Sequence, residues 1–553
     1  MTSYEDDIVD GILREYAARK LRRYTTEGHW QEVAELVAPS FINTFFEWGE
    51  MVPGMKKTEK QIDSKAALAL SRFGAIMDSL LTPRNSKWHG LEASDPVLNK
   101  NRNVKLWFED TTRRLFKYRY APTANYSSQN QQIYRSLGAF GTGPMFIDRL
   151  YSMDGTKGFR YKCMSLGNVY ISENHQGVVD GFIRRLKLTA RQAMQRADWA
   201  ATLPQQIKDA AEKDPEKRWV FLHCVKPRTD YNPERLDAKG KLFGSYYISL
   251  DLKKLLSEGG YNTFPMPTTR YEQDPEEEYG RGPAMQVLPS IKTKNTEKRI
   301  ILKQGHRAVD QVLLMHDDGL AAFSLKPGSM NPGTVSSDGR PLVVPLPGGN
   351  VQVGLEMMQE EDQIIDSAFL VDLFKLLLDD PKIFTATQVT EMIAQRGILI
   401  SPTVGRQQSE YLGPKIDREL DLGSDMGLFL PMPPELIEAK GDYSVVYTSP
   451  LARAARAEEV AGLQRSIERA LAVVNVTQNP APLDHYDWDV IIPEAAEIDG
   501  VPQRWMRDKA MVEQIRTARQ KVKQAQMEIQ AAPGAAALQK SNAIAQGAKQ
   551  KAA

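Results

Sequence analysis

The chain has 553 residues, of which 42% are hydrophobic and 25% are charged. These proportions are typical of folded globular protein, and the length is too great for one ordinary domain. Its 71 lysines and arginines balance 70 aspartates and glutamates, which excludes a protein that grips nucleic acid over its whole surface but leaves room for local basic patches. No apolar run approaches the roughly 18 residues of a membrane span, and the acidic N-terminus lacks the apolar core of a signal peptide.

The first third of the chain is predicted to be helical, because apolar residues recur there at the helical period. The pattern begins with Ile8, Ile12, Tyr16 and Leu21. Thr58-x-x-Gln61 resembles a capping box and predicts a second helix that stops at Pro83, since proline cannot continue the hydrogen-bond ladder. That helix carries Leu70, Phe73, Met77 and Leu80 on one face, and two more helices are expected over 102–120 and 125–138.

Short β-rich runs punctuated by turns follow over 144–250, which predicts an α+β region with a mostly antiparallel sheet. A helix over about 189–213 is expected to interrupt them. The chain holds two cysteines, expected to be structural thiols of a reducing compartment. The predicted strands are Met145–Ile147, Phe159–Met164, Val169–Ile171, Phe182–Leu188, Trp219–Val225 and Tyr246–Leu250, and the cysteines are Cys163 and Cys224.

Two helices of opposite charge are predicted around a module rich in Gly and Pro at 310–355. The first, over 284–309, is basic. The second, over 356–378, is acidic and apolar on two sides, so it must be covered on both. One row is Ile365, Phe369, Leu373 and Leu376, and the other is Leu370, Phe374 and Leu377. Either these are ordinary surface helices, or they pair within or between subunits with opposite charges setting the register.

The remaining sequence predicts a long helix marked by Leu463, Ile467, Ala470 and Val474, and a last basic amphipathic helix that begins near Met511. Residues 531–553 are rich in Ala, Gln and Lys without an acidic residue. This composition predicts a disordered tail or a frayed helix.

The sequence offers only weak candidates for a nucleotide-binding, metal-binding or catalytic site. The run Gly138-Ala-Phe-Gly141-Thr-Gly143 lacks the Gly-Lys-Ser/Thr ending of a phosphate loop and lies between a helix and a strand. A tight turn is the better interpretation. The clusters at His316–Asp318 and Asp484–Asp489 are each incomplete as metal sites. Without a nucleophile elbow, the sequence predicts no enzyme, no cofactor and no metal.

Several stretches, in order along about 60–475, resemble the head-to-tail connector (portal) proteins of podoviruses. They are Asp63–Pro83 followed by Lys87-Trp88, Leu137–Gly143, Tyr279–Met285, Phe384–Glu391 with Leu412–Ile416, and Tyr447–Ala454. The resemblance implies a portal fold, mostly helical with a central antiparallel sheet, long stem helices and a small α/β clip. Its expected parts are a wing (1–280 and 386–500), stem helices (281–309 and 356–378), a clip (310–355), a tunnel-loop region (379–385), a crown helix (501–530) and the tail (531–553).

The resemblance also implies a dodecameric ring at one capsid vertex of the virion, assembled in the host cytoplasm. Double-stranded DNA would pass through it non-specifically during packaging, retention and ejection. The implied partners are the major capsid protein, a scaffolding protein, the terminase motor and tail adaptor proteins. DNA-facing residues are guessed as Lys382, Lys292, Lys298 and Arg299, and Ile365, Phe369, Leu373 and Leu376 are expected to pack between subunits.

Two alternatives stay open. The chain could be another structural virion protein, such as a tail adaptor or an internal core protein, which would lack the helix–module–helix excursion. It could also be a DNA-processing enzyme, which would require a carboxylate or nucleophile cluster that the sequence does not show.

Overall fold

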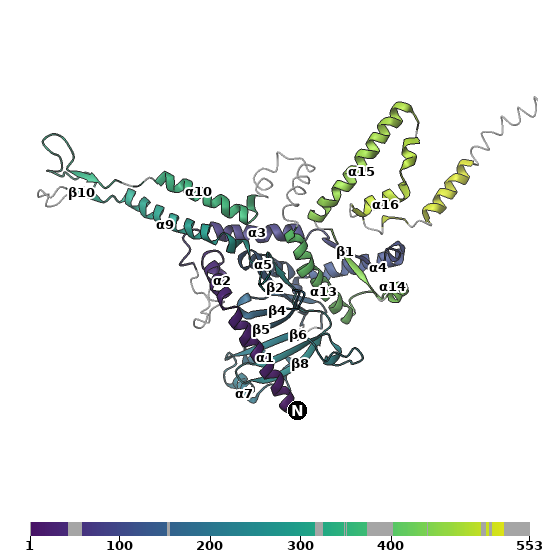
Figure 1. The fold of residues 1–553 in the computed structure, drawn as a ribbon. Coiled ribbons are helices and arrows are strands. Elements are labelled where there is room, and N and C mark those ends of the chain that lie inside the picture. The colour runs from purple at the N-terminus through teal and green to yellow at the C-terminus, as the bar shows by residue number, and fades with distance from the viewer. Residues whose placement is uncertain are drawn as a thin grey trace, which may run out of the picture. The chain divides into compact units, whose positions relative to one another are not determined.

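The computed structural model describes residues 2–41, 58–151, 155–315, 324–347, 349, 351–372, 402–439, 441–448, 450–479, 481–498, 501, 505–507 and 511–524. Figure 1 shows a mixture of helices and sheets, which confirms the α+β class. The chain divides into two compact units. The first comprises residues 1–89, 113–430 and 449–455, and the second comprises 90–112, 431–448 and 456–553.

The chain begins with three helices, α1 (Thr2–Arg22), α2 (Tyr24–Leu36) and α3 (Lys65–Leu81). In α1 the buried side chains are those of Val9, Ile12 and Tyr16, whereas Leu21 is 80% exposed, so the apolar face ends one turn earlier than predicted. The capping box at Thr58 is wrong: α3 begins at Lys65, whose backbone N–H donates to Asp63 Oδ2 at 3.0 Å.

Helix α4 (Arg102–Arg119) and helix α5 (Tyr126–Phe140) lie within two residues of the predicted ranges. Gly141 ends α5 in the left-handed conformation, at φ 71°, and its N–H donates to Leu137 O at 2.9 Å. A Cβ at Gly141 would lie 2.3 Å from the backbone oxygen of Gly280. The Gly-rich run is therefore the tight helix-to-strand turn that was predicted, with no room for a side chain.

A five-stranded antiparallel sheet forms the centre of the first unit, with strand order β4-β5-β6-β7-β8. Its strands are β4 (Val169–Glu173), β5 (Val179–Thr189), β6 (Arg218–Pro227), β7 (Phe243–Ser249) and β8 (Lys254–Tyr261). A smaller sheet has the order β3-β2-β9, with β2 (Thr142–Arg149), β3 (Phe159–Cys163) and β9 (Thr268–Arg270). All six predicted strands are confirmed.

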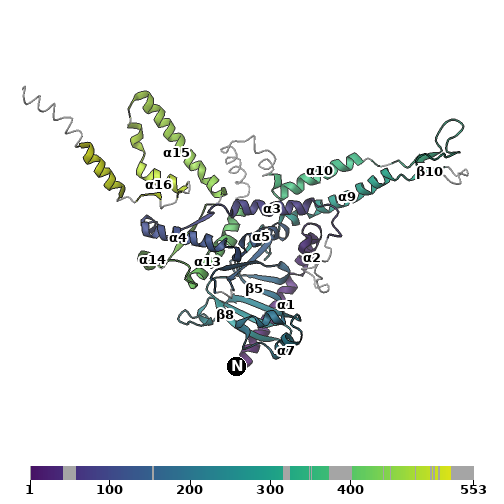
Figure 2. The same cartoon turned by 180° about the vertical axis from the view of Figure 1, so that it is seen from behind.

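Helices cover both faces of the large sheet (Figure 2). On one face, Ile12 and Tyr16 of α1 pack with Ile183, Leu222 and Ile248. The opposite face is covered by α6 (Ala190–Met194), a 3-10 turn (Ala197–Trp199) and α7 (Gln205–Lys213). The single helix predicted over 189–213 is thus broken, because Pro204 directly precedes α7 and has no N–H to continue a helix through it.

Two long helices follow the sheet. After the short α8 (Pro283–Gln286), helix α9 runs over Leu288–Val309. Two short strands, β10 (Leu313–Met315) and β11 (Val343–Pro345), pair with each other. Helix α10 (Val351–Ala368) begins five residues before the predicted 356. It ends before Leu370, which has φ 59°, a conformation that interrupts a right-handed helix. Residues 371–372 are helical again, and the rest of the predicted range, 373–378, lies outside the described residues.

Residues 402–407 are helical and lead through a π-helical turn (Gln408–Leu412) into α13 (Gly413–Asp425). In the second unit, β1 (His89–Ala93) pairs with β12 (Tyr443–Tyr447), near α14 (Pro434–Glu438) in sequence. The long helix marked by Leu463 is confirmed as α15 (Pro450–Thr477), followed by α16 (Trp488–Ile498). The last predicted helix is present at 511–524, and the expected tail at 531–553 lies outside the described residues.

Candidate functional site

The most distinctive feature of the first unit is a hairpin of two antiparallel helices, α9 and α10, which leaves the body of the unit and is closed by β10 and β11 (Figures 1 and 2). The helices approach closely near their outer ends, where a Cβ at Gly354 would lie 3.1 Å from the side chain of Ile301. The prediction that the basic and acidic helices pair is therefore confirmed within one chain. We call these elements, residues 288–368, the helical hairpin.

Ion pairs hold the root of the hairpin to the body. Lys294 of α9 contacts Asp362 of α10, and its side chain is only 4% exposed. Lys65 Nζ, at the start of α3, lies 2.6 Å from Asp366 Oδ2 on α10. Because one partner of each pair, Lys294 or Asp366, is largely shielded from water, these pairs fix the register of the two helices more strongly than fully exposed pairs do.

Asp63 binds two lysines of α9 at this root. Its carboxylate lies 2.9 Å from Lys298 Nζ and 3.3 Å from Lys294 Nζ. Burial opposes ionisation of Asp63, but the hydrogen bonds from Lys298 and from the backbone of Lys65 outweigh it and hold the pKa of Asp63 below its ordinary value. The side chain therefore stays a carboxylate at neutral pH.

Asn295 joins the same segment to α9 through its amide. Its Oδ1 accepts the backbone N–H groups of Ile62 at 2.8 Å and Asp63 at 3.1 Å. Its Nδ2 donates to Lys60 O at 3.1 Å. Three main-chain groups that precede α3 are thus satisfied by one side chain, which positions Asp63 against the lysines of α9.

The guessed DNA-facing residues fall in different environments. Lys292 pairs with Glu32 of α2 at 2.6 Å, and Lys298 pairs with Asp63. Both ammonium groups thus already have carboxylate partners. Arg299 is exposed and has no ion pair within the described part of the chain. Lys382 lies outside the described residues.

Two of the residues expected to pack between subunits are already buried in the single chain. Ile365 and Phe369 are 1% and 0% exposed within a single chain, and the ring of Phe369 meets that of Phe73 on α3 at 6.2 Å. Helix α3 therefore covers Phe369, one of the four residues expected to pack between subunits. Leu373 and Leu376 lie outside the described residues. The apolar side chains that helices α9 and α10 leave exposed are others, namely Ile300, Leu302, Val309, Val353, Leu355, Met357 and Ile364.

Sequence reasoning missed the ion pairs at the hairpin root, although a signal was present. Lys294 and Lys298, and likewise Asp362 and Asp366, are spaced four residues apart, so each pair lies on one side of its helix. The spacing indicates one charged stripe on each helix. It does not reveal that Asp63 and Lys65, more than two hundred residues away, complete the network.

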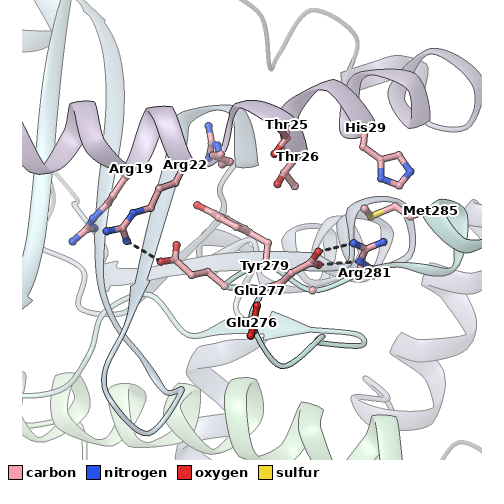
Figure 3. Close-up of a pocket in the computed structure, with 13 residues that line it drawn as sticks. Arg19, Arg22, Thr25, Thr26, His29, Glu276, Glu277, Tyr279, Arg281 and Met285 are labelled. Carbon is pink, nitrogen blue, oxygen red and sulfur yellow. Dashed lines mark hydrogen bonds and ion pairs between the residues drawn. The ribbon is translucent and has the colours of Figure 1, made fainter.

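A cavity of about 520 Å³ lies between the α1–α2 junction and residues 276–285 (Figure 3). Arg22 lies 3.5 Å from Glu278, and Arg281 lies 2.5 Å from Glu277. Burial, and then the charge of Arg281, lower the pKa of His29. Because the arginines and carboxylates largely neutralise each other, the lining forms a polar crevice without a strong charge of either sign.

The core of the first unit holds a second polar network. Arg119 and Glu419 are both fully buried, and Arg119 Nε donates to both oxygens of Glu419 at 3.1 Å. Lys415 donates to Tyr126 Oη at 2.6 Å. Burial, and then the charge of Arg119, lower the pKa of Lys415 well below its ordinary value. The network is enclosed by packed aromatic rings, so it ties α4 and α13 together rather than presenting a reactive group.

The C-terminal helix at 511–524 is basic and largely exposed. Arg516 Nη1 donates to Asp489 Oδ2 of α16 at 2.6 Å. This aspartate belongs to the acidic run considered as a metal site. Within the described ranges, no group of three His, Cys, Asp or Glu side chains is placed to hold a metal ion, and no helix there has the length and apolar character needed to span a bilayer.

Residues 10–506 match the family described as bacteriophage head to tail connecting protein. The chain belongs to this connector family. Among its relatives is a portal protein of Salmonella phage epsilon15, 27% identical over 97% of this chain and 94% of the relative. A probable portal protein of Bordetella phage BPP-1 is 24% identical over 89% of this chain and 87% of the relative. The resemblance to podovirus connectors is thus confirmed, and the match includes the whole helical hairpin.

Proposed function

We propose that the chain is a portal subunit that forms a ring-shaped channel at one vertex of a phage capsid. The observation that carries this proposal is the helical hairpin, which projects from the first unit and keeps apolar side chains exposed on both helices. An excursion of this kind cannot bury its apolar surface within one chain, and neighbouring subunits arranged around an axis would cover it. The family match over residues 10–506 supports the same function.

The charge balance suits a conduit for double-stranded DNA. Each phosphate that a protein neutralises adds affinity through counterion release, so a strongly basic lining would hold DNA rather than let it pass. The chain has a formal net charge of +1, and Lys292 and Lys298 are already paired with carboxylates. The protein therefore acts as a structural connector, and the energy for DNA movement comes from a separate motor.

The proposed parts follow the elements of the structure. The sheet and the helices around it form the wing, α9 and α10 form the stem, and the short β10–β11 ribbon with residues 310–350 forms the clip, where tail adaptors dock. The basic helix at 511–524 belongs to a crown that faces the capsid interior. The proposed partners are further copies of the chain in a dodecamer, the capsid and scaffolding proteins, and the terminase motor.

The mass of the purified protein in solution tests this proposal. Light scattering with negative-stain imaging is expected to find particles of about twelve times 62.2 kDa with a central hole. A chain that lacks residues 310–350 should keep its wing fold by circular dichroism but fail to attach tails. Strict monomers at all concentrations, or normal tail attachment by the truncated chain, would contradict the proposal and favour another virion component.

A further inference from the structure

The helical hairpin has two broad faces that differ in charge. One face is turned toward residues 60–65, so that Lys298 lies there beside Lys60 and Lys65 near the root. Each of these lysines pairs with a carboxylate, of Asp63, Glu35 and Asp366 respectively, but the side chains of Lys60 and Lys298 remain 67% and 36% exposed and can reach a second acidic partner. Because successive helical residues are separated by about 100°, Leu302, Val309 and Leu355 project from this same side farther out. We call it the lysine face. Its three apolar side chains are 49%, 90% and 43% exposed.

The opposite side of the seam between α9 and α10 carries carboxylates. Glu297 of α9 lies near Glu360 and Glu361 of α10, and burial, followed by repulsion from Glu361 and Glu360, raises the pKa of Glu297. By the same helical spacing, Ile300, Val353, Met357 and Ile364 project from this side. We call it the glutamate face. Its apolar side chains are between 46% and 59% exposed.

The glutamates lack partners that a folded chain normally provides. One carboxylate oxygen of Glu297 and one of Glu361 are shielded from solvent, and neither accepts a hydrogen bond within the described residues. Buried carboxylate oxygens without a donor are costly. Lys294 is the nearby cation, but it is already bound to Asp362 and Asp63. The cluster is thus a site where an additional ammonium group would be stabilising.

We infer that the lysine face of one subunit docks onto the glutamate face of the next subunit, with Lys60 and Lys298 meeting the cluster of Glu297, Glu360 and Glu361. This inference rests on the proposed ring function. The two faces lie at the same level of the hairpin, since residues 297 and 298 are neighbours. A contact between two different faces is head-to-tail, so repeating it around an axis closes a ring and covers both apolar rows at once.

Charge reversal in two separate chains tests the contact. One chain carries Glu360→Lys and Glu361→Lys, and the other carries Lys60→Glu and Lys298→Glu. Each variant alone places like charges across every interface, so each is expected to lose at least tenfold of the wild-type ring yield. In an equimolar mixture, alternating subunits restore opposite charges at every contact, and rings with equal amounts of both chains are expected to return.

Glu212→Lys is the matched control, because Glu212 is exposed on α7, which lies outside the helical hairpin. It should assemble as the wild type does. Circular dichroism of each variant establishes that lost rings do not reflect lost folding, which matters for Lys298 because it also binds Asp63. If the wild type forms rings while both reversed variants also assemble normally, or if the folded variants do not rescue each other, the inference is overturned and the ring function stands.

Cysteine cross-linking provides a second readout. A chain with Lys60→Cys and Glu360→Cys should give a ladder of disulfide-linked oligomers under mild oxidation, whereas either single variant should give no ladder. The native thiols will not interfere, because burial raises the pKa of Cys163 and of Cys224 to about 12. Assembled rings without a ladder from the double variant would place these two faces apart and overturn the inference.

Discussion

Replacing Asp63 with Asn should loosen the root of the hairpin by about 2–3 kcal/mol, because hydrogen bonds to charged groups contribute about 1.5–3 kcal/mol each. The Asp63 side chain is 10% exposed and binds Lys298 and the nearly buried Lys294. Asparagine can still accept the N–H of Lys65, and Lys294 keeps Asp362 as its partner. The loss should therefore stay below the cost of an unpaired buried charge.

Native-state hydrogen exchange measures this effect locally, which suits a chain too large for simple two-state unfolding. The amides of Ile62 and Asp63, which donate to Asn295, should exchange about 30- to 150-fold faster in the variant, since 1.4 kcal/mol corresponds to tenfold. The matched control is Glu32→Gln. It removes the partner of Lys292 on the same helix, but these side chains are 52% and 48% exposed, so the change should cost about 0–1 kcal/mol.

The effect of Asp63 should also depend on pH with a definite sign. Its folded pKa lies below the ordinary value near 3.9, so the stabilisation is present above that value and is lost as the pH falls through the folded pKa. The gap between the wild type and Asp63→Asn should therefore shrink in acid. Equal exchange rates in Asp63→Asn and Glu32→Gln at neutral pH would refute the argument that burial makes this pair strong.

Three further outcomes are expected. Gly141→Ala should destabilise the chain by about 3 kcal/mol or more, because the φ of Gly141 is 71° and a Cβ would strike a backbone oxygen. Gly11→Ala should instead stabilise the chain by about 0.5–1 kcal/mol, because the new Cβ meets no atom within 4 Å. The thermal midpoints of the two variants should therefore shift in opposite directions. Arg119→Met should cost about 3–5 kcal/mol by leaving the Glu419 carboxylate without its ion-pair partner, and adding Glu419→Leu should recover most of it. Hydrogen exchange of the amides of α13 measures this cost locally. Because burial lowers the pKa of Lys415 in the folded chain, the stability of the wild type should rise with pH toward the ordinary lysine pKa near 10.4. Lys415→Met should flatten that rise. An unchanged slope of stability against pH in this variant would contradict the lowered pKa.

Periodicity predicted much of the fold, since it reflects which face of an element is buried. The alternation in Phe182–Leu188 and Trp219–Val225 identified two central strands whose opposite faces both meet helices. Strand β8 was missed because its sequence ends in Glu-Gly-Gly-Tyr, which lacks a strand pattern. Its conformation comes from pairing with β7, a contact that no local window contains.

The candidate site was likewise predictable where local sequence determines it and unpredictable where distant residues do. The opposite charges of α9 and α10 were visible in the sequence, and their pairing is confirmed. The partner of Phe369 was not visible in the sequence, because an apolar row indicates that a side chain is covered but does not indicate which surface covers it. Phe73 of α3, almost three hundred residues earlier, provides that cover. The role of Asn295 had no signal, since asparagine on a helix usually faces solvent.

In the proposed ring, the length of α9 would set the height of the channel wall that passing DNA meets. The 22 residues of α9 span about 33 Å at 1.5 Å per residue, which is about the length of ten base pairs or one turn of B-DNA. A channel wall of that height would meet both grooves and every phosphate orientation at the same time. Rotating or advancing the duplex would then exchange one set of contacts for an equivalent set, so the interaction energy would vary little along the path and the DNA would slide with little friction.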